Sequence, residues 1–168
     1  MRLNQQNGLR FYTNVDSDVI TALRDAGVTV KMGTLISPED LLSGEELTLE
    51  TAESKRINVE YNSNQYYTEG DFSGVVGSIV NILDSNAVRD FIGRGYVTAE
   101  YNGVSKTVYA NYYNSDVGNN KRSIGYLAYK IQKDTSYYPT LGQTHKEVVD
   151  KYADFYAAKK DPSDADIW

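Results

Sequence analysis

Alternating apolar and polar positions are densest in residues 91–130, where they predict a strand, a tight turn, a second strand and a helix. The turn is Asn102-Gly103, because both residues tolerate a positive φ and this dipeptide is the strongest short-range signal for a two-residue hairpin. The helix is expected near 121–133, where apolar residues recur at helical spacing. This strand, turn, strand and helix form the unit on which we expect the rest of the chain to pack.

A turn at this position fixes the register of the two strands. Val97 then lies opposite Val108 on one side of the hairpin, and Tyr96 lies opposite Tyr109 on the other side. The first side is apolar and the second is aromatic and rich in hydroxyl groups. An antiparallel pair with one buried face has this pattern, so the following helix is expected to cover the apolar side.

The remaining periodicity predicts an α+β fold in which an antiparallel sheet carries about three helices. The expected strands are 9–15, 28–36, 72–82, 94–101 and 104–113, and the expected helices are 17–26, 121–133 and 144–158. In 9–15, Leu9 and Phe11 alternate with Arg10 and Tyr12, which predicts one buried side and places Tyr12 on the other side. The strand at 28–36 has an alternative, a parallel pairing with the first strand, because a helix connects the two. Gly33 interrupts this strand and predicts a bend or a bulge.

Other stretches have weaker periodicity. Residues 37–64 are expected to form a loop with short strands at 47–49 and 57–61, and residues 65–69 are polar and tyrosine-rich without an assigned element. Residues 144–147 have the spacing of a capping box in front of the last helix.

Length and composition indicate one domain. The chain has 168 residues, 40% of them hydrophobic, and no Pro/Gly/Ser-rich linker divides it. We expect a single domain over residues 1–160, followed by a flexible tail at 161–168 that contains three Asp, one Pro and the lone Trp.

Charge and hydropathy narrow the choice of partners. The net charge of −6 and the pI near 4.8 argue against nucleic acid and against anionic membranes, both of which attract clustered Lys and Arg. The sequence contains no run near the ~18–20 apolar residues of a membrane-spanning helix, and it begins without a signal-peptide pattern. The chain is therefore expected to be either cytosolic or an internal piece of a longer secreted protein. It has no cysteine, which excludes disulfides, thiolate zinc sites and cysteine nucleophiles.

The sequence singles out no catalytic residue or cofactor. His145 is the only histidine, so a serine triad would have to use it, but its position in the first turn of a helix favours an exposed structural residue. Glycosidase chemistry needs two carboxylates about 5–10 Å apart, and none of the 23 acidic residues stands out as half of such a pair. Asn114, Asp116 and Asn119 group oxygen side chains that suit calcium, but the EF-hand pattern is absent, and a strand-to-helix loop is the favoured interpretation.

Tyrosine is the biased part of the composition, with 15 Tyr against 4 Phe and 1 Trp. Tyrosine suits adhesive surfaces, although strands with one solvated edge also explain it. The candidate binding surface is the pair Tyr96 and Tyr109, with Tyr112 and Tyr113 nearby, on the hairpin side away from the helix. The alternative is that a second layer, such as the 144–158 helix, buries the pair as ordinary core.

Four short motifs carry a resemblance to a known kind of module. They are Gly8-Leu9-Arg10-Phe11, Met32-Gly33-Thr34-Leu35-Ile36, Arg94-Gly95-Tyr96-Val97 and Lys121-Arg122-Ser123-Ile124. In this order they resemble a module of long surface-exposed proteins of gut and other anaerobic Gram-positive bacteria. The match spans roughly residues 8–133 and leaves 134–168 outside. The resemblance implies an extracellular or cell-surface module with no catalytic residues of its own, and a virion protein carrying a related module is the alternative.

These observations leave three functional classes. The first is a non-catalytic surface module that binds a glycan or a surface protein. The second is an architectural spacer or virion component, and the third is a glycan-active enzyme. Binding predicts an exposed cluster of aromatic rings flanked by Asn and Asp, a spacer predicts scattered or buried tyrosines, and an enzyme predicts a cleft with converging titratable groups.

Overall fold

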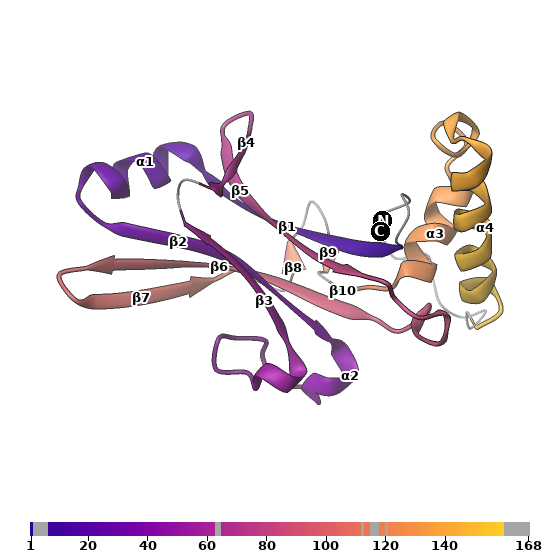
Figure 1. Cartoon of the computed structure of the whole chain (residues 1–168), viewed down its shortest axis with the longest axis horizontal. Helices are drawn as coiled ribbons and strands as arrows, with labels where there is room; N and C mark the ends of the chain where they lie inside the picture. Colours follow the sequence, from indigo (N-terminus) through magenta and orange to yellow (C-terminus); the bar gives the residue numbers. More distant parts are fainter. Residues whose placement is uncertain (2–6, 63–64, 112, 115–117, 120, 160–168) are drawn as a thin grey trace.

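The computed structural model describes residues 1, 7–62, 65–111, 113–114, 118–119 and 121–159 (Figure 1). Its strands are β1 (Gly8–Asp16), β2 (Thr29–Pro38), β3 (Ile57–Asn62), β4 (Tyr67–Glu69), β5 (Phe72–Val80), β6 (Phe91–Tyr101), β7 (Val104–Tyr109), β8 (Tyr113–Asn114), β9 (Gly118–Asn119) and β10 (Lys121–Arg122). Its α-helices are α1 (Ser17–Asp25), α2 (Glu39–Leu42), α3 (Ile124–Lys133) and α4 (Gln143–Ala157). Short 3₁₀ helices are η1 (Glu53–Lys55), η3 (Asp84–Asn86) and η4 (Tyr138–Thr140). The predicted tail at 161–168 lies outside the described residues.

The strands confirm the predicted α+β class but form more than one sheet. Within the described residues, β1, β5 and β4 make a three-stranded sheet, and β10, β6, β2 and β3, with β7 also on β6, make a five-stranded sheet. All the pairings are antiparallel. The expectation of a single sheet was therefore wrong, and so was the parallel alternative, because β2 lies between β3 and β6 and not beside β1.

The two sheets face each other at short distance because glycines line their interface. A Cβ at Gly93 would overlap the ring of Phe11, and one at Gly95 would overlap Thr13 across the gap. The hydroxyl groups of Thr13 and Thr34 meet there at 2.6 Å. Phe11 and Thr13 belong to the side of β1 that the alternation predicted to be buried, so that side faces the other sheet.

The hairpin between β6 and β7 has the predicted turn and register. Asn102 and Gly103 have φ values of 50° and 77°, as a type I′ turn requires. Tyr96 lies opposite Tyr109, and Val97 lies opposite Val108. Local turn chemistry therefore fixed this element.

The helices do not cover the apolar side of this hairpin, which corrects the prediction. Val104 and Val108 are 72% and 60% exposed. The pair α3 and α4 lies at the far end of the molecule from the β6–β7 turn (Figure 1). There Ile124 and Val149 pack against Ile36 and other residues at the opposite ends of the strands.

Two local predictions were also wrong, and so was the bulge that Gly33 suggested as an alternative to a bend. Residues 47–49 form no strand, whereas 67–69 form β4. Helix α4 begins at Gln143 with Gly142 as its N-cap, so the predicted capping box at Thr144 is not used. Strand β2 pairs without interruption through Gly33, so it has no bulge. Within the part of the chain that the structure describes, no helix is both long and apolar enough to cross a membrane.

Candidate functional site

The predicted tyrosine pair exists, but one member is buried. The ring centroids of Tyr96 and Tyr109 are 6.2 Å apart with planes at 50°. Tyr96 is only 1% exposed. Tyr96 is therefore a core residue and cannot supply the exposed half of a binding platform.

Residues 39–56, which we call the covering segment, account for this burial. Leu42 and Leu47 from this segment pack with Tyr96 and with Leu35 of β2. The alternative that a second layer buries the pair therefore holds for Tyr96, but the layer is this segment and not the 144–158 helix. The covering segment was not predicted as a layer, because its apolar residues are scattered along the sequence.

The hydroxyl group of Tyr96 remains hydrogen-bonded inside this layer. Its oxygen lies 2.7 Å from Glu60 Oε2 and 2.9 Å from Asn58 Oδ1. A phenol has one proton to donate, and of these two acceptor oxygens the charged Glu60 carboxylate is the stronger and the nearer. Burial, followed by the bond to Glu60, raises the pKa of Tyr96 well above its ordinary value.

Tyr109 is half-buried and holds the covering segment in place. The Arg94 guanidinium lies 4.9 Å from its ring centroid. The Tyr109 hydroxyl oxygen accepts a hydrogen bond from Leu49 N at 3.1 Å and lies 3.4 Å from Glu50 Oε2. The Arg94 guanidinium also donates to Ala110 O and to the Glu46 carboxylate, so it joins the strands to the covering segment.

The other predicted site residues lie beyond β7. Tyr112 and Asp116 fall outside the described residues. Tyr113, Asn114 and Asn119 belong to the backbone of the β8–β9 ribbon, and their side chains are not described. Among the residues that are described, no three His, Cys, Asp or Glu side chains are grouped closely enough to hold a metal ion.

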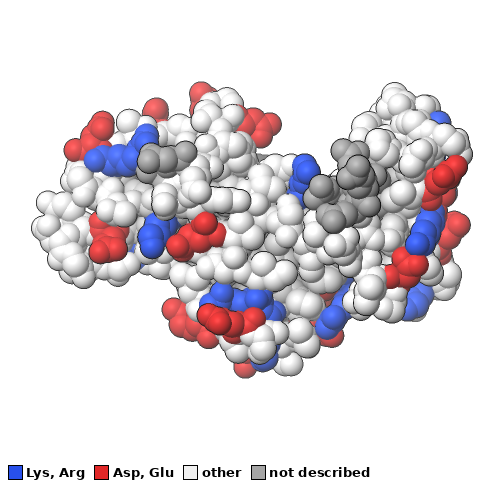
Figure 2. All heavy atoms as spheres, in the orientation of Figure 1, with Lys and Arg blue, Asp and Glu red and all other residues white. Residues whose placement is uncertain are grey.

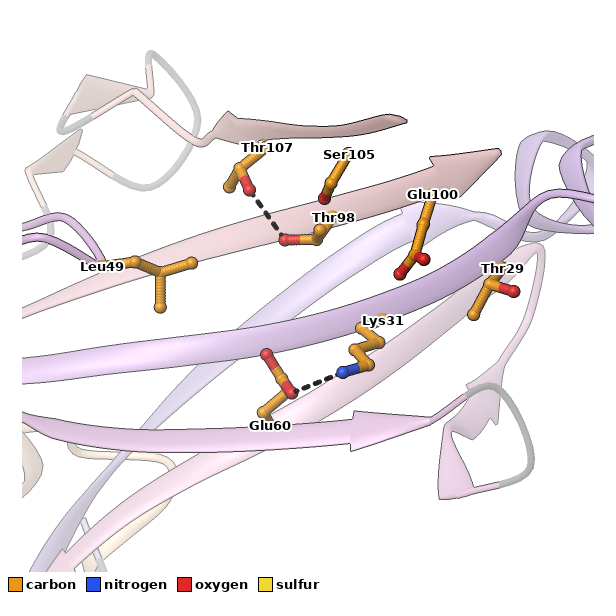
Figure 3. A pocket seen from close by; sticks show the side chains of 8 residues that line it. All are labelled: Thr29, Lys31, Leu49, Glu60, Thr98, Glu100, Ser105 and Thr107. Atoms are coloured by element: carbon orange, nitrogen blue, oxygen red, sulfur yellow. Dashed lines mark hydrogen bonds and ion pairs between the residues drawn. The ribbon is translucent and has the colours of Figure 1, made fainter. Parts of the chain in front are cut away.

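A polar groove of about 250 Å³ lies beside the buried pair, on the same face of the five-stranded sheet (Figure 3). Its lining comes from four strands and the covering segment: Thr29, Lys31, Leu49, Glu60, Thr98, Glu100, Ser105 and Thr107. Lys31 Nζ lies 3.7 Å from Glu60 Oε1, and the hydroxyls of Thr98 and Thr107 are 2.8 Å apart. The groove therefore offers hydroxyl groups and charges but no aromatic ring.

The two carboxylates of the groove come from positions that are far apart on the sheet. Glu60 lies opposite Gly33, and Glu100 lies opposite Thr29, on strands at the two sides of β2. With strands ~4.8 Å apart and residues ~3.3 Å apart along a strand, the two Cα atoms are separated by roughly 16 Å. Lys31 pairs with Glu60, and Glu100 has no hydrogen-bond or ion-pair partner among the described residues. The polar side chains on the floor of the groove are therefore spread along it and do not form one cluster.

A second aromatic pair, with one exposed and one half-buried ring, lies on the other side of the molecule, on the outer face of the three-stranded sheet. The rings of Tyr12 and Tyr67 meet edge to face, with centroids 6.2 Å apart and planes at 87°. Tyr12 is 57% exposed. The hydroxyl of Tyr67 donates to Asn14 Oδ1. We call Tyr12, Tyr67 and Asn14 the aromatic corner.

Charged and aromatic side chains surround the aromatic corner. Register places Asp16 and Phe72 in the next row of the same face, and Phe72 is 48% exposed. Glu69 lies opposite Phe72 on β4. Burial raises the pKa of Tyr67, and the negative charge of Glu69 raises it further.

Sequence reasoning did not predict the aromatic corner as a site, because the candidate tyrosines were those on and after the hairpin. The alternation along β1 gave Tyr12 its outward direction, but residues 65–69 were left without a strand. The missed signal is Gly70-Asp71, a hairpin dipeptide between β4 and β5, where Gly70 has φ of 56°. A hairpin there brings Tyr67 opposite Gly74, which itself lies opposite Asn14.

Comparison of the chain with protein-family models, with curated proteins and with solved structures found no match.

Proposed function

We propose that this protein is a non-catalytic binding module that recognises glycans, and that the aromatic corner is its binding surface. The observation that carries the proposal is the contact between the exposed ring of Tyr12 and the half-buried ring of Tyr67, which is bonded to the exposed Asn14 side chain. An exposed aromatic cluster flanked by Asn and Asp is the feature that separates a binding module from a spacer. The resemblance of residues 8–133 to modules of bacterial surface proteins supports an extracellular or cell-surface location.

The aromatic corner has the physical properties that sugar binding needs. A pyranose ring presents a face of C–H groups that stacks on an aromatic ring, and its hydroxyl groups bond to polar side chains at the rim. Tyr12 offers an exposed ring surface, and its edge-to-face contact with Tyr67 restrains it. A restrained tyrosine loses little conformational entropy on binding, so the contact gains more of its interaction free energy.

The charge distribution supports a partner other than nucleic acid. Lys and Arg side chains are interspersed with Asp and Glu over the face shown in Figure 2. With a net charge of −6, this distribution offers no basic stripe for a phosphate backbone on that face.

An architectural spacer or virion component is the second candidate. The burial of Tyr96 and of Tyr152, which is 4% exposed, favours it, because part of the tyrosine content is then ordinary core. The exposed corner is the feature that a spacer has no use for.

Glycan-array and cell-wall pull-down measurements on three proteins test the proposal. The wild type should bind, and Tyr12→Ala should lose about tenfold or more in affinity, in line with the loss of one stacked aromatic anchor. Tyr101→Ala is the matched control, because Tyr101 is 54% exposed but lies on the distant hairpin. The absence of wild-type binding in both measurements, or equal losses in the two variants, would favour the spacer.

A further inference from the structure

We propose that the ligand of the aromatic corner is an acidic pyranose, whose ring stacks on Tyr12 and whose carboxylate pairs with Arg10. This inference rests on the proposed function and names the chemical class of the glycan. Three features of the outer face of the three-stranded sheet support it. They are the position of Arg10 beside Tyr12, the availability of the Arg10 guanidinium, and the polar groups on the two sides of the Tyr12 ring.

Arg10 is the charged residue nearest to Tyr12 among the residues of β1, β4 and β5 on this face. The two residues lie two positions apart on β1 and point to the same side, so their Cα atoms are roughly 7 Å apart. Both side chains are exposed. The long Arg10 side chain therefore reaches a substituent of a sugar ring that lies over Tyr12.

The acidic residues of the same face lie farther from Tyr12. Asp16 is four positions along β1, at roughly 13 Å, and Glu69 is two strands across and four positions along, at roughly 16 Å. The Debye length is about 8 Å at physiological salt, so both carboxylates are largely screened at Tyr12. The charge that a ligand on Tyr12 meets is therefore that of Arg10, although the whole chain carries a net charge of −6.

The Arg10 guanidinium is available to a ligand. It has no hydrogen-bond or ion-pair partner among the described residues. By contrast, the guanidinium groups of Arg89 and Arg94 pair with Asp40 and Glu46. A guanidinium presents a planar fork of N–H donors that matches the two oxygens of a carboxylate. An acidic sugar supplies the carboxylate that the described part of the protein does not.

Polar groups flank the Tyr12 ring on both sides along the strand. On one side, Ser78 lies opposite Arg10 on β5, is half-buried, and has no hydrogen-bond partner within the described part of the chain. On the other side, the Tyr67 hydroxyl donates to Asn14 Oδ1, so the Asn14 amide nitrogen keeps its protons for donation. A pyranose over Tyr12 thus has a cation for its carboxylate at one end and a donor for its hydroxyl groups at the other.

Calorimetric titration at about 0.1 M salt, where the Debye length is about 10 Å, tests the inference. It compares the methyl glycosides of glucose and galactose with those of glucuronic and galacturonic acid. We expect the wild type to bind at least one uronic acid about fivefold more tightly than the matching neutral glycoside, the upper range for a solvated ion pair. In about 1 M salt, where the Debye length falls to about 3 Å, this preference should shrink to less than about twofold.

Two variants that each remove one positive charge locate the preference. Arg10→Gln should bind the uronic acid and the neutral glycoside equally, because the pairing charge is gone while the Tyr12 ring remains. Lys106→Gln is the matched control: Lys106 is exposed on β7 of the distant hairpin, so this variant should keep the wild-type preference. Both changes are at exposed side chains, so the melting temperatures should stay at the wild-type value and confirm folding.

The outcomes separate the inference from the proposed function. Equal binding of a uronic acid and its neutral glycoside by the wild type, binding of neutral glycosides alone, or equal losses of preference in the two variants would overturn the inference and leave glycan binding standing. If only longer glycans of the array bind, the same comparison is made between those that carry and those that lack an acidic sugar. Failure to bind any sugar on the array or in titration would overturn both.

Discussion

The ring of Tyr96 on β6 lies directly against the backbone of Gly33 on β2, so that a Cβ at residue 33 would overlap the end of the ring. Because Tyr96 is 1% exposed and enclosed by the covering segment, the ring cannot move aside. Gly33→Ala should therefore destabilise the protein by about 1–3 kcal/mol, the usual range for overpacking. Urea denaturation measures this change.

The matched control for this prediction is Gly142→Ala. Gly142 has open space around it and an ordinary φ of −66°, so its substitution should cost less than about 1 kcal/mol. Equal free energies of unfolding in the two alanine variants would show that the Tyr96 ring does not need the space left by the absent side chain at residue 33.

The hairpin tip offers a second prediction, since its apolar side has no helix over it. Val108→Thr should change the free energy of unfolding by less than about 0.5 kcal/mol, because Val108 is 60% exposed. Val30→Thr, the same substitution at a valine that is 3% exposed, buries a hydroxyl group and should cost about 1–3 kcal/mol. A large loss in Val108→Thr would mean that another element covers the hairpin after all.

The contacts of Arg94 indicate that this residue holds the covering segment against the strands. Its guanidinium bonds Glu46 at 3.0 Å, Leu47 O at 3.2 Å and Ala110 O at 2.9 Å. Arg94→Met removes these three bonds between the strands and the covering segment, so we expect a loss of about 2 kcal/mol and faster amide exchange at residues 47–49. Hydrogen-exchange NMR and urea denaturation give the two values.

Glu46→Gln tests whether the ion pair itself matters. Glu46 is 69% exposed in its side chain, so this variant should lose less than about 0.5 kcal/mol. Equal effects of the two substitutions would show that the charge pair, and not the bonds to the backbone, fixes the segment.

The raised pKa of Tyr66 predicts that the protein loses stability at high pH. Burial, with a smaller effect of the Glu60 charge, raises the pKa of Tyr66 to about 12, and its hydroxyl donates to Val30 O at 3.0 Å. In the unfolded chain the phenol loses its proton near the ordinary value of 10.0. The stabilising contribution of the protonated phenol is therefore complete below pH 10 and is lost as the pH rises toward 12.

Urea midpoints measured between pH 9 and 12 should fall for the wild type and fall less steeply for Tyr66→Phe. Tyr101→Phe, at an exposed tyrosine of the hairpin, is the control and should follow the wild type. Identical slopes in all three proteins would contradict an ionisation-linked role for Tyr66.

The sequence by itself determined the elements whose signals are local. Asn102-Gly103 fixed the hairpin and its register, because a two-residue turn leaves one way to pair the flanking strands. The start of α1 is likewise a local feature, since the Asp16 side chain accepts a hydrogen bond from Asp18 N two residues on. The alternation along β1 likewise gave Tyr12 its outward direction, because side chains in a strand point to opposite faces in turn.

Only the tertiary structure decided which faces are covered. Tyr96 and Tyr12 both lie on strand faces that the pattern predicted to be solvated, yet one is 1% and the other 57% exposed. The difference comes from Leu42 and Leu47, which lie about fifty residues before Tyr96 in the chain and pack over its face. Likewise, Tyr67 reaches Asn14 because β5 brings together strands that are distant in sequence. Such contacts depend on how separate segments pack as a whole, and a local pattern carries no information about its distant partner.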